Sequence, residues 1–108
     1  MAKAYALLQF NIIDHALFGS YVKSAYPTIL THHGQVIVAA ENPDPQEGSL
    51  TTSRTTIIEF PSKEDAMNWY NSTEYNSIKH LRHEATNHGT FVVLDAWQRP
   101  QGVGASGG

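Results

Sequence analysis

The sequence predicts an α+β fold in which a four-stranded antiparallel sheet carries helices on one face. The apolar segments follow the order strand, helix, strand, strand, helix pair and strand, so each half of the chain resembles a β-α-β unit. Several predicted strands are apolar on both faces, although helices can cover only one face of such a sheet. A second copy of the chain is the simplest cover for the other face, and we therefore expect a homodimer with its sheets packed face to face.

The first half of the chain is predicted to form a strand, a helix and a second strand. Residues 4–13 are rich in apolar and aromatic side chains and contain neither glycine nor proline, which is typical of a strand. Asp14 is a good N-cap for the helix that follows, and Pro27 is expected to kink or restart that helix. Gly34 is suited to end the helix, and residues 36–40 form the second strand.

A polar loop is predicted between the two halves. Residues 41–53 contain two prolines and a glycine, and the loop is long for a link between neighbouring strands. Two interpretations stay open, a mobile lid and a tolerated excursion of the surface, and the second is favoured.

The second half is predicted to form a strand, two helices and a last strand. Residues 54–60 are an apolar strand, Ser62 caps a first helix, and Ser72 caps a second helix that ends at the His-Gly pair of residues 88–89. Residues 90–97 form the last strand, which is again apolar on both faces. The completed order is that of a ferredoxin-like fold.

Size and composition indicate one folded domain and exclude several classes of protein. The chain has 108 residues, and we assign residues 1–97 to the domain and the Gly-rich residues 98–108 to a disordered tail. The absence of cysteine excludes disulfides, thiol catalysis and iron–sulfur clusters. The net charge is −3 and the seven Lys and Arg residues are scattered, which argues against nucleic-acid binding. No apolar run approaches the ~18 residues of a membrane span and no signal peptide is evident, so we expect no membrane insertion and a cytoplasmic location.

The most distinctive motif lies in residues 54–75. An Arg and a run of β-forming residues precede Glu-Phe-Pro-Ser, an Ala, a Trp-Tyr pair, a Ser and a Tyr, which here are Arg54, Glu59, Phe60, Pro61, Ser62, Ala66, Trp69, Tyr70, Ser72 and Tyr75. Arg82 follows, and a looser N-terminal pattern is matched by Asp14, Tyr21 and His33-Gly34. On these residues the chain resembles domain-of-unknown-function family 1330, a branch of the dimeric α/β-barrel superfamily. It departs from the family pattern at Phe18, where a Tyr is usual, and at Gln35, which replaces a second Gly.

The resemblance covers residues 4–97 and implies a ferredoxin-like protomer that dimerises sheet to sheet as a dimeric α/β barrel. It implies no particular reaction. The wider superfamily includes cofactor-independent monooxygenases, small-ring isomerases, dehydratases and haem-degrading enzymes. A fold that carries so many chemistries does not by itself identify a function.

Four polar side chains on otherwise apolar elements are candidate catalytic residues, namely His33, Glu59, Arg82 and Tyr21. His33 offers an acid or base, and Glu59, near the end of an apolar strand, is suited to proton transfer when its carboxylate is desolvated. The alternative for Glu59 is a structural ion pair with Arg54 or Arg82, which is favoured because a buried carboxylate needs such a partner. Arg82 either clamps an anionic ligand or makes a structural contact, and both interpretations stay open.

Aromatic side chains of the motif are candidate ligand-binding residues. Trp69, Tyr70 and Tyr75, together with Arg54, would line a small and largely apolar pocket in each subunit. Aromatic residues at such positions more often belong to the core, and that alternative is favoured. Two histidines lie three residues apart on the last predicted helix, but no third ligand at a recognisable spacing accompanies them, so we expect neither a metal nor an organic cofactor.

Two functions fit these observations. The first is a cofactor-independent enzyme of the isomerase, lyase or monooxygenase type that acts on a small apolar or aromatic metabolite. The second is a non-catalytic dimeric module that binds a small ligand or a protein partner. An open pocket with convergent polar groups would favour the enzyme, and a closed, dry interior would favour the module.

Overall fold

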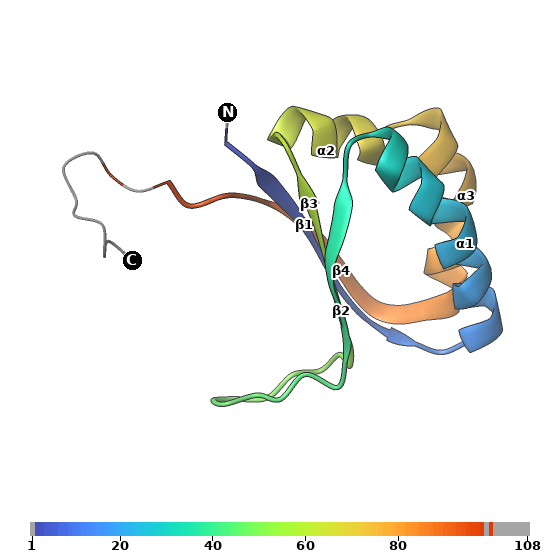
Figure 1. Ribbon diagram of the computed structural model, residues 1–108. Helices are drawn as coiled ribbons and strands as arrows, with labels where there is room; N and C mark the ends of the chain where they lie inside the picture. Colours follow the sequence, from blue (N-terminus) through green and yellow to red (C-terminus); the bar gives the residue numbers. More distant parts are fainter. Residues whose placement is uncertain (1, 99, 101–108) are drawn as a thin grey trace.

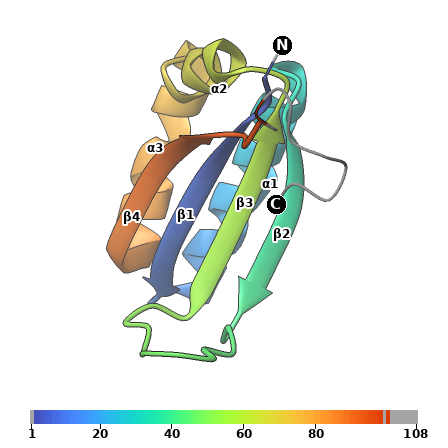
Figure 2. The same cartoon turned by 90° about the vertical axis from the view of Figure 1, so that its left-hand side faces the viewer.

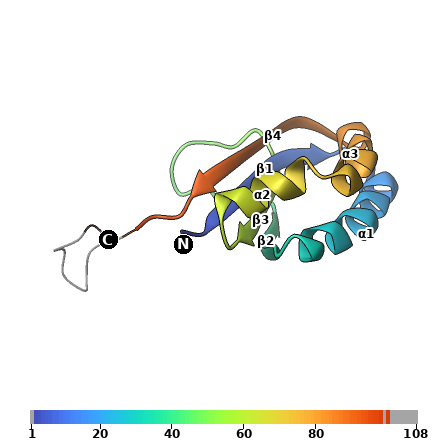
Figure 3. The same cartoon turned by 90° about the horizontal axis from the view of Figure 1, so that it is seen from above.

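The computed structural model describes residues 2–98 and 100 and arranges them in two layers (Figure 1). One layer is a sheet of four strands, which are β1 (Ala4–Ile12), β2 (Gln35–Glu41), β3 (Arg54–Phe60) and β4 (Thr86–Asp95). The other layer consists of the helices α1 (His15–Thr31), α2 (Lys63–Tyr70) and α3 (Thr73–Ala85). All of these helices lie on the same face of the sheet, as the view from above also shows (Figure 3). In the described part of the chain, no helix combines the length and the apolar character needed to cross a membrane.

The strands are antiparallel and lie side by side in the order β2-β3-β1-β4 (Figure 2). In the two pairings that β1 makes, Leu7 stands opposite Ile57 of β3 and Val92 of β4. This topology confirms the predicted ferredoxin-like arrangement. The strand predicted at residues 54–60 has the predicted bounds, whereas the tail predicted at residues 98–108 lies outside the described residues apart from 98 and 100 and stays a prediction.

The core lies between the two layers because alternate residues of each strand point toward the helices. Trp69 and Tyr75 are fully buried, and their ring centroids lie 4.2 Å apart. The indole Nε1 of Trp69 donates to Thr28 Oγ1 over 2.9 Å, which ties α2 to α1. The sheet contributes the buried side chains of Ala4, Ala6, Leu8, Phe10, Ile58 and Phe60.

Side-chain caps begin all three helices at the predicted residues. Asp14 Oδ1 accepts from the backbone N–H of Leu17, Ser62 Oγ from that of Asp65, and Ser72 Oγ from that of Tyr75, over 2.9, 3.1 and 3.1 Å. Each cap satisfies an N–H group that has no partner inside its helix. The cap at Ser72 lets α3 begin directly after α2 ends, and the change of direction brings α3 alongside α1.

The helix predicted to kink or restart at Pro27 does not restart there, and the kink stays a prediction. The helix α1 continues through this residue to Thr31. Proline removes one backbone hydrogen bond, and because Pro27 is exposed near the end of the helix, water can replace the lost donor.

The end predicted for the helix that Ser72 caps, α3, is also wrong. The helix α3 ends at Ala85, whose carbonyl accepts from the backbone N–H groups of Ile13 at 2.8 Å and Asp14 at 3.2 Å, and β4 begins at the next residue. The His-Gly pair at 88–89 therefore lies inside a strand. The register shifts there against β1, and His88 has a φ of 53°, so the pair forms a β-bulge instead of a helix end.

Candidate functional site

An apolar cavity of about 170 Å³, here called the α1 cavity, lies between α1 and the sheet. Phe18, Tyr21, Ala25 and Ile29 line it from α1, because their spacing of three or four residues places them on one face of a helix. Strand side chains complete the wall, and these are Leu8, Phe10, Val36, Ala39, Arg54, Thr56 and Ile58. A dry cavity of ~150 Å³ with a similar lining is large enough to hold benzene, so the α1 cavity has room for one aromatic ring.

Arg54 supplies the positive charge of the α1 cavity. It is the first residue of β3 and faces the helices with Thr56 and Ile58, because these residues alternate along the strand. Its Nε donates to Thr56 Oγ1 over 3.2 Å, and its Cζ lies 5.3 Å from the ring centroid of Phe18. The only carboxylate near it among the described residues is that of Glu41, at 3.7 Å and half exposed, so the ion pair is loose.

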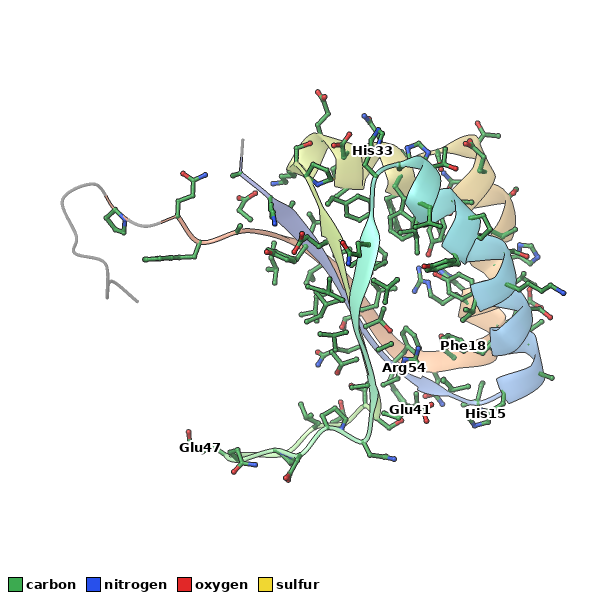
Figure 4. All side chains as sticks on the ribbon, viewed as in Figure 1. His15, Phe18, His33, Glu41, Glu47 and Arg54 are labelled. Carbon is green, nitrogen blue, oxygen red and sulfur yellow. The ribbon has the colours of Figure 1, made fainter. Side chains whose placement is uncertain are left out.

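Figure 4 shows where this charge lies in the molecule. Arg54 and Glu41, from the sheet, approach Phe18 and His15, from the first turn of α1, at one end of the space between the two layers. Val22, with 42% of its surface exposed, also lines the α1 cavity, so the cavity opens toward solvent along α1. A ligand in the α1 cavity can therefore contact the guanidinium of Arg54, which lines the cavity.

Tyr21 connects the α1 cavity to a buried chain of polar groups. Its hydroxyl lies 2.8 Å from that of Tyr75, and Arg82 Nε donates to the same Tyr75 oxygen over 3.2 Å. Tyr75 and Arg82 are seven residues apart on α3 and share its buried face. When Tyr75 gives its own proton to Tyr21, the Tyr21 O–H is left to donate to another acceptor.

Burial keeps Tyr21 in its neutral form. Desolvation by burial, followed by the neighbouring Tyr75, raises the pKa of Tyr21 well above its ordinary value. The nearby charge of Arg82 acts in the opposite direction but is the smaller effect. Tyr21 therefore stays protonated at neutral pH and can donate a hydrogen bond. Such a donor is suited to stabilise an oxygen that carries negative charge.

The structure brings together only part of the predicted site. Tyr21 and Arg54 line the α1 cavity, and Arg82 reaches it through Tyr75. His33 is exposed beyond the C-terminal end of α1, at the opposite end of the molecule from Arg54 (Figure 4). Glu59 stands on the helix-free face of the sheet, so neither His33 nor Glu59 meets Tyr21.

The predicted ion pair of Glu59 with Arg54 or Arg82 is wrong. Glu59 Oε1 lies 3.1 Å from Lys3 Nζ, and the hydrogen bond to Glu59, followed by its charge, raises the pKa of Lys3. Arg54 and Glu59 are five residues apart on one strand, an odd separation that places their side chains on opposite faces. Arg82 lies on the helix side and is likewise separated from Glu59 by the sheet.

The predicted aromatic ligand-binding residues pack in the core and do not line the α1 cavity. Trp69 lies 5.6 Å from Phe60 and 5.9 Å from Phe91 between ring centroids, and Tyr75 is fully buried beside it. Tyr70 is half-buried, and Lys79 Nζ lies 3.7 Å from its ring centroid. The packing of these residues agrees with the structural alternative.

Phe18 and Ile58 line the α1 cavity but were not predicted from the sequence as site residues. The signal was available, because Phe18 precedes Tyr21 by three residues on one helix and Ile58 shares the strand parity of Arg54. No group of three or more His, Asp or Glu side chains within residues 2–98 and 100 could hold a metal ion.

The family model described as "Domain of unknown function (DUF1330)" matches residues 3–96. No curated protein matches the chain.

Several solved structures share the fold. A protein of unknown function from Rhodopseudomonas palustris superposes with a TM-score of 0.76 at 13% identity, over 90% of this chain and 84% of its own. A dimeric protein of unknown function with a ferredoxin-like fold, from Bacteroides fragilis, has a TM-score of 0.62 at 14% identity, over 87% and 96%. SnoaB, a cofactor-independent oxygenase from Streptomyces nogalater, has a TM-score of 0.66 at 9% identity, over 91% and 96%. Structural similarity at such low sequence identity shows that the fold is shared, and it says nothing about a shared activity.

Proposed function

The chain belongs to the DUF1330 family, which is described only as a domain of unknown function, and on that premise we propose that it is a homodimer whose subunits each bind a small aromatic molecule in the α1 cavity. The α1 cavity itself carries the proposal, since it is an apolar space of about 170 Å³ with a phenol in its wall and a guanidinium at one end. Apolar walls with a few placed polar groups are the usual make-up of a small-molecule site.

The polar groups of the α1 cavity select the chemistry of the ligand. Tyr21 offers an O–H donor, and Arg54 offers several N–H donors and a positive charge. A ring that carries a carboxylate or a phenolate oxygen satisfies both groups, whereas a cationic ligand would be repelled by Arg54. The ligand class is therefore a small aromatic or apolar acid.

The helix-free face of the sheet supports the homodimer. Its side chains form a shallow groove of about 380 Å³ lined by Tyr5, Leu7, Ile37, Ile57, Leu94, Asp95, Ala96 and Trp97. Ile37, Leu94 and Trp97 are 44%, 48% and 64% exposed, although each is apolar. Apolar side chains that are exposed together on one face of a sheet favour association through that face. The Bacteroides fragilis protein of the same fold is dimeric.

Binding to the α1 cavity is tested with benzoate and with toluene as its neutral counterpart. We expect both compounds to shift the amide resonances of α1 and β3, with benzoate binding more tightly because its carboxylate reaches Arg54. Arg54→Met should weaken benzoate binding about tenfold and leave toluene binding unchanged.

Ala25→Leu, which fills the cavity from α1, should weaken the binding of both compounds. Lys23→Met removes an exposed charge from the same helix and serves as the control. Equal benzoate affinity in the Arg54 and Lys23 variants would overturn the proposal.

Catalysis without a cofactor is a second candidate function, which the Tyr21–Tyr75–Arg82 chain favours. Tyr21 would donate to a carbonyl oxygen of the ligand as that oxygen gains negative charge, and Arg82 would support the donation through Tyr75. Enolisation of an aromatic keto acid is the simplest reaction of this kind, with water as the base that removes the carbon-bound proton. SnoaB shows that the fold can host cofactor-independent oxygen chemistry, which is an analogy of fold.

The catalytic candidate is tested by the keto–enol tautomerisation of phenylpyruvate, whose ring and carboxylate suit the α1 cavity. We expect acceleration by the wild-type protein and a loss of about a hundredfold in kcat for Tyr21→Phe, which keeps the ring and removes the donor. His33→Ala and Glu59→Gln should keep full activity, because both side chains lie outside the cavity. If the wild-type protein binds benzoate but does not accelerate the tautomerisation, catalysis is excluded for this substrate class and binding stands.

A further inference from the structure

Arg82 is a buried cation that meets no carboxylate. It is only 6% exposed, and residues 2–98 and 100, which include every Asp and Glu of the chain, place no carboxylate oxygen within 4.0 Å of it. Its contacts are with neutral groups. Nε donates to the Tyr75 hydroxyl over 3.2 Å, Nη2 lies 3.5 Å from His83 Nε2, and Cζ lies 5.5 Å from the ring centroid of Phe91.

A guanidinium without a counter-charge is expensive to bury. Water is removed from the charge, and a protein interior repays that cost only when an anion and well-placed hydrogen bonds replace the water. A phenol and an aromatic ring face offset part of the cost. Arg82 has five N–H groups, and no carboxylate among the described residues accepts a hydrogen bond from any of them.

A polar hollow of about 190 Å³ lies beside this charge, at the junction of α3 and β4. Arg82 and His83 line it from the last turn of α3, and Thr86, Asn87, His88 and Gly89 line it from β4. The β-bulge at His88 lifts the strand out of its regular register and so shapes one wall. This α3–β4 hollow shares no lining residue with the α1 cavity.

The lining of the hollow is rich in donors and contains no carboxylate. The Asn87 amide and the imidazole of His83 can each donate a hydrogen bond beside the guanidinium. A helix C-terminus normally repels anions, but Thr86 Oγ1 donates to the Arg82 carbonyl over 2.7 Å, and the Ala85 carbonyl accepts two backbone bonds. These two carbonyl oxygens are therefore already occupied.

We propose that the α3–β4 hollow binds a small oxyanion, a carboxylate or inorganic phosphate, with Arg82 as its anchor and with Asn87 and His83 as additional donors. The planar guanidinium of an arginine can hold two oxygens of such an anion at once. The volume of the hollow suffices, because water occupies ~30 Å³ per molecule in the liquid and these anions are the size of a few waters.

The site is tested by titrating the full-length protein with inorganic phosphate, and separately with acetate, at constant ionic strength with chloride as the reference. We expect saturable shifts of the amide resonances of residues 83–89 with a dissociation constant in the millimolar range, together with a rise in Tm. Resonances of the helix-free face should not move. If neither anion gives saturable shifts up to tens of millimolar, the inference is wrong.

Variants assign the anion to the hollow. Arg82→Lys keeps the charge but not the two-pronged donor, and should weaken phosphate or acetate binding at least about tenfold. Asn87→Ala changes an exposed side chain that the fold does not need, and should weaken binding several-fold. Asn68→Ala, on the exposed face of α2, is the matched control and should bind as the wild type does. Because Arg82→Lys risks unfolding, Asn87→Ala alone decides, and unchanged affinity in that variant overturns the inference. A dimer structure with a carboxylate of the partner subunit on Arg82 would overturn it as well.

Discussion

Tyr75 is the residue through which the buried polar groups of this protein meet. Its hydroxyl receives the Nε–H of Arg82 and lies 2.8 Å from the hydroxyl of Tyr21, while its ring is fully buried. Arginine has only donors, so the oxygen of Tyr75 must accept from it, and this leaves the Tyr75 proton for Tyr21. The positive charge of Arg82 can thus polarise a phenol that faces the α1 cavity without entering the cavity itself.

The raised pKa of Tyr21 makes the stability of the fold depend on alkaline pH. Its ordinary pKa is 10.0, and burial raises the pKa well above this in the folded state. Above about pH 10 the unfolded chain releases this proton while the folded protein keeps it, so the stabilising effect is complete below that pH and decreases as the pH rises, with a limiting slope of ~1.4 kcal/mol per pH unit. The free energy of unfolding in urea, measured from pH 8 to pH 11, should therefore fall more steeply for the wild type than for Tyr21→Phe.

Tyr26→Phe provides the control for this experiment, because Tyr26 is 48% exposed. Its profile should run parallel to that of the wild type throughout. Parallel profiles for all three proteins would mean that Tyr21 ionises as readily in the folded state as in the unfolded chain.

Residues with a local signal were predictable from the sequence, and residues whose environment depends on the opposite layer were not. The shared face of Tyr75 and Arg82 follows from their spacing of seven, and the structure has it. The partner of Glu59 was predicted wrongly from chemistry alone, although strand parity already separates Glu59 from Arg54. His33 carries no signal of its position, because a histidine after a helix can face a pocket or the solvent.

At the scale of elements, the junction of α1 and β2 determines how the helix returns to the sheet. The backbone N–H of Gly34 donates to the Ile29 carbonyl over 2.8 Å, and that of His33 to the Leu30 carbonyl over 3.1 Å, which together form a Schellman motif. His33 occupies the left-handed position of this motif with a φ of 68°. The need for glycine at residue 34 is steric, since Phe60 and Ile29 press against its backbone.

Substitutions at this junction should change stability in opposite directions. A Cβ at residue 34 would lie 2.7 Å from both Ile29 Cγ2 and Phe60 Cε1, so Gly34→Ala should lower the free energy of unfolding by about 1–3 kcal/mol. His33→Gly should raise it by about 0.5–1 kcal/mol, because glycine relieves the left-handed strain but has more entropy to lose on folding. Urea unfolding measures both.

Gly19→Ala is the matched control for the steric argument, because no atom lies within 4 Å of a Cβ at that exposed helical position. It should stabilise the protein by about 1 kcal/mol through helix propensity. His33→Gly should also leave benzoate binding unchanged, and a loss of binding would return His33 to the site. Destabilisation by Gly34→Ala no greater than that by substitutions at exposed positions would contradict the close packing at Phe60.

Elements were predictable where their own residues define them. The caps at Asp14, Ser62 and Ser72 are local, and each starts a helix as predicted. The end of α3 depends on tertiary contacts, because Ile13 and Asp14, between β1 and α1, supply the two N–H groups that hold the Ala85 carbonyl. The pairing with β1 then places residues 86–89 in β4. A short stretch of sequence does not reveal such strand pairing. Here the pairing outweighs the local preference of a His-Gly pair for a helix end.

At the scale of the whole molecule, the two faces of the sheet have different roles. The helix side contains the α1 cavity and the buried chain from Tyr21 to Arg82. The other side carries the apolar groove, which no helix or strand of the described residues covers. The loop between β2 and β3 extends past it, with Glu47 far from the helices (Figure 4). This loop therefore stands away from the α1 cavity and toward the face on which a second subunit would lie.

Charge on the helix-free face should dissociate the proposed homodimer without unfolding the protomer. Val92 and Leu94 of β4 are 44% and 48% exposed, so Val92→Lys/Leu94→Lys adds charge where the isolated protomer is already in contact with water. In a two-fold dimer both copies of each lysine would enter the apolar interface, and each apolar side chain that is no longer buried there costs ~1.5–3 kcal/mol. Sedimentation velocity at micromolar concentration should show a dimer for the wild type and a monomer for this variant, with the far-ultraviolet circular dichroism unchanged. Leu30→Lys, which places one such charge at a 52% exposed position on α1, should remain dimeric. A wild type that sediments as a monomer, or a lysine variant that stays dimeric, would mean that something other than a second copy covers this face.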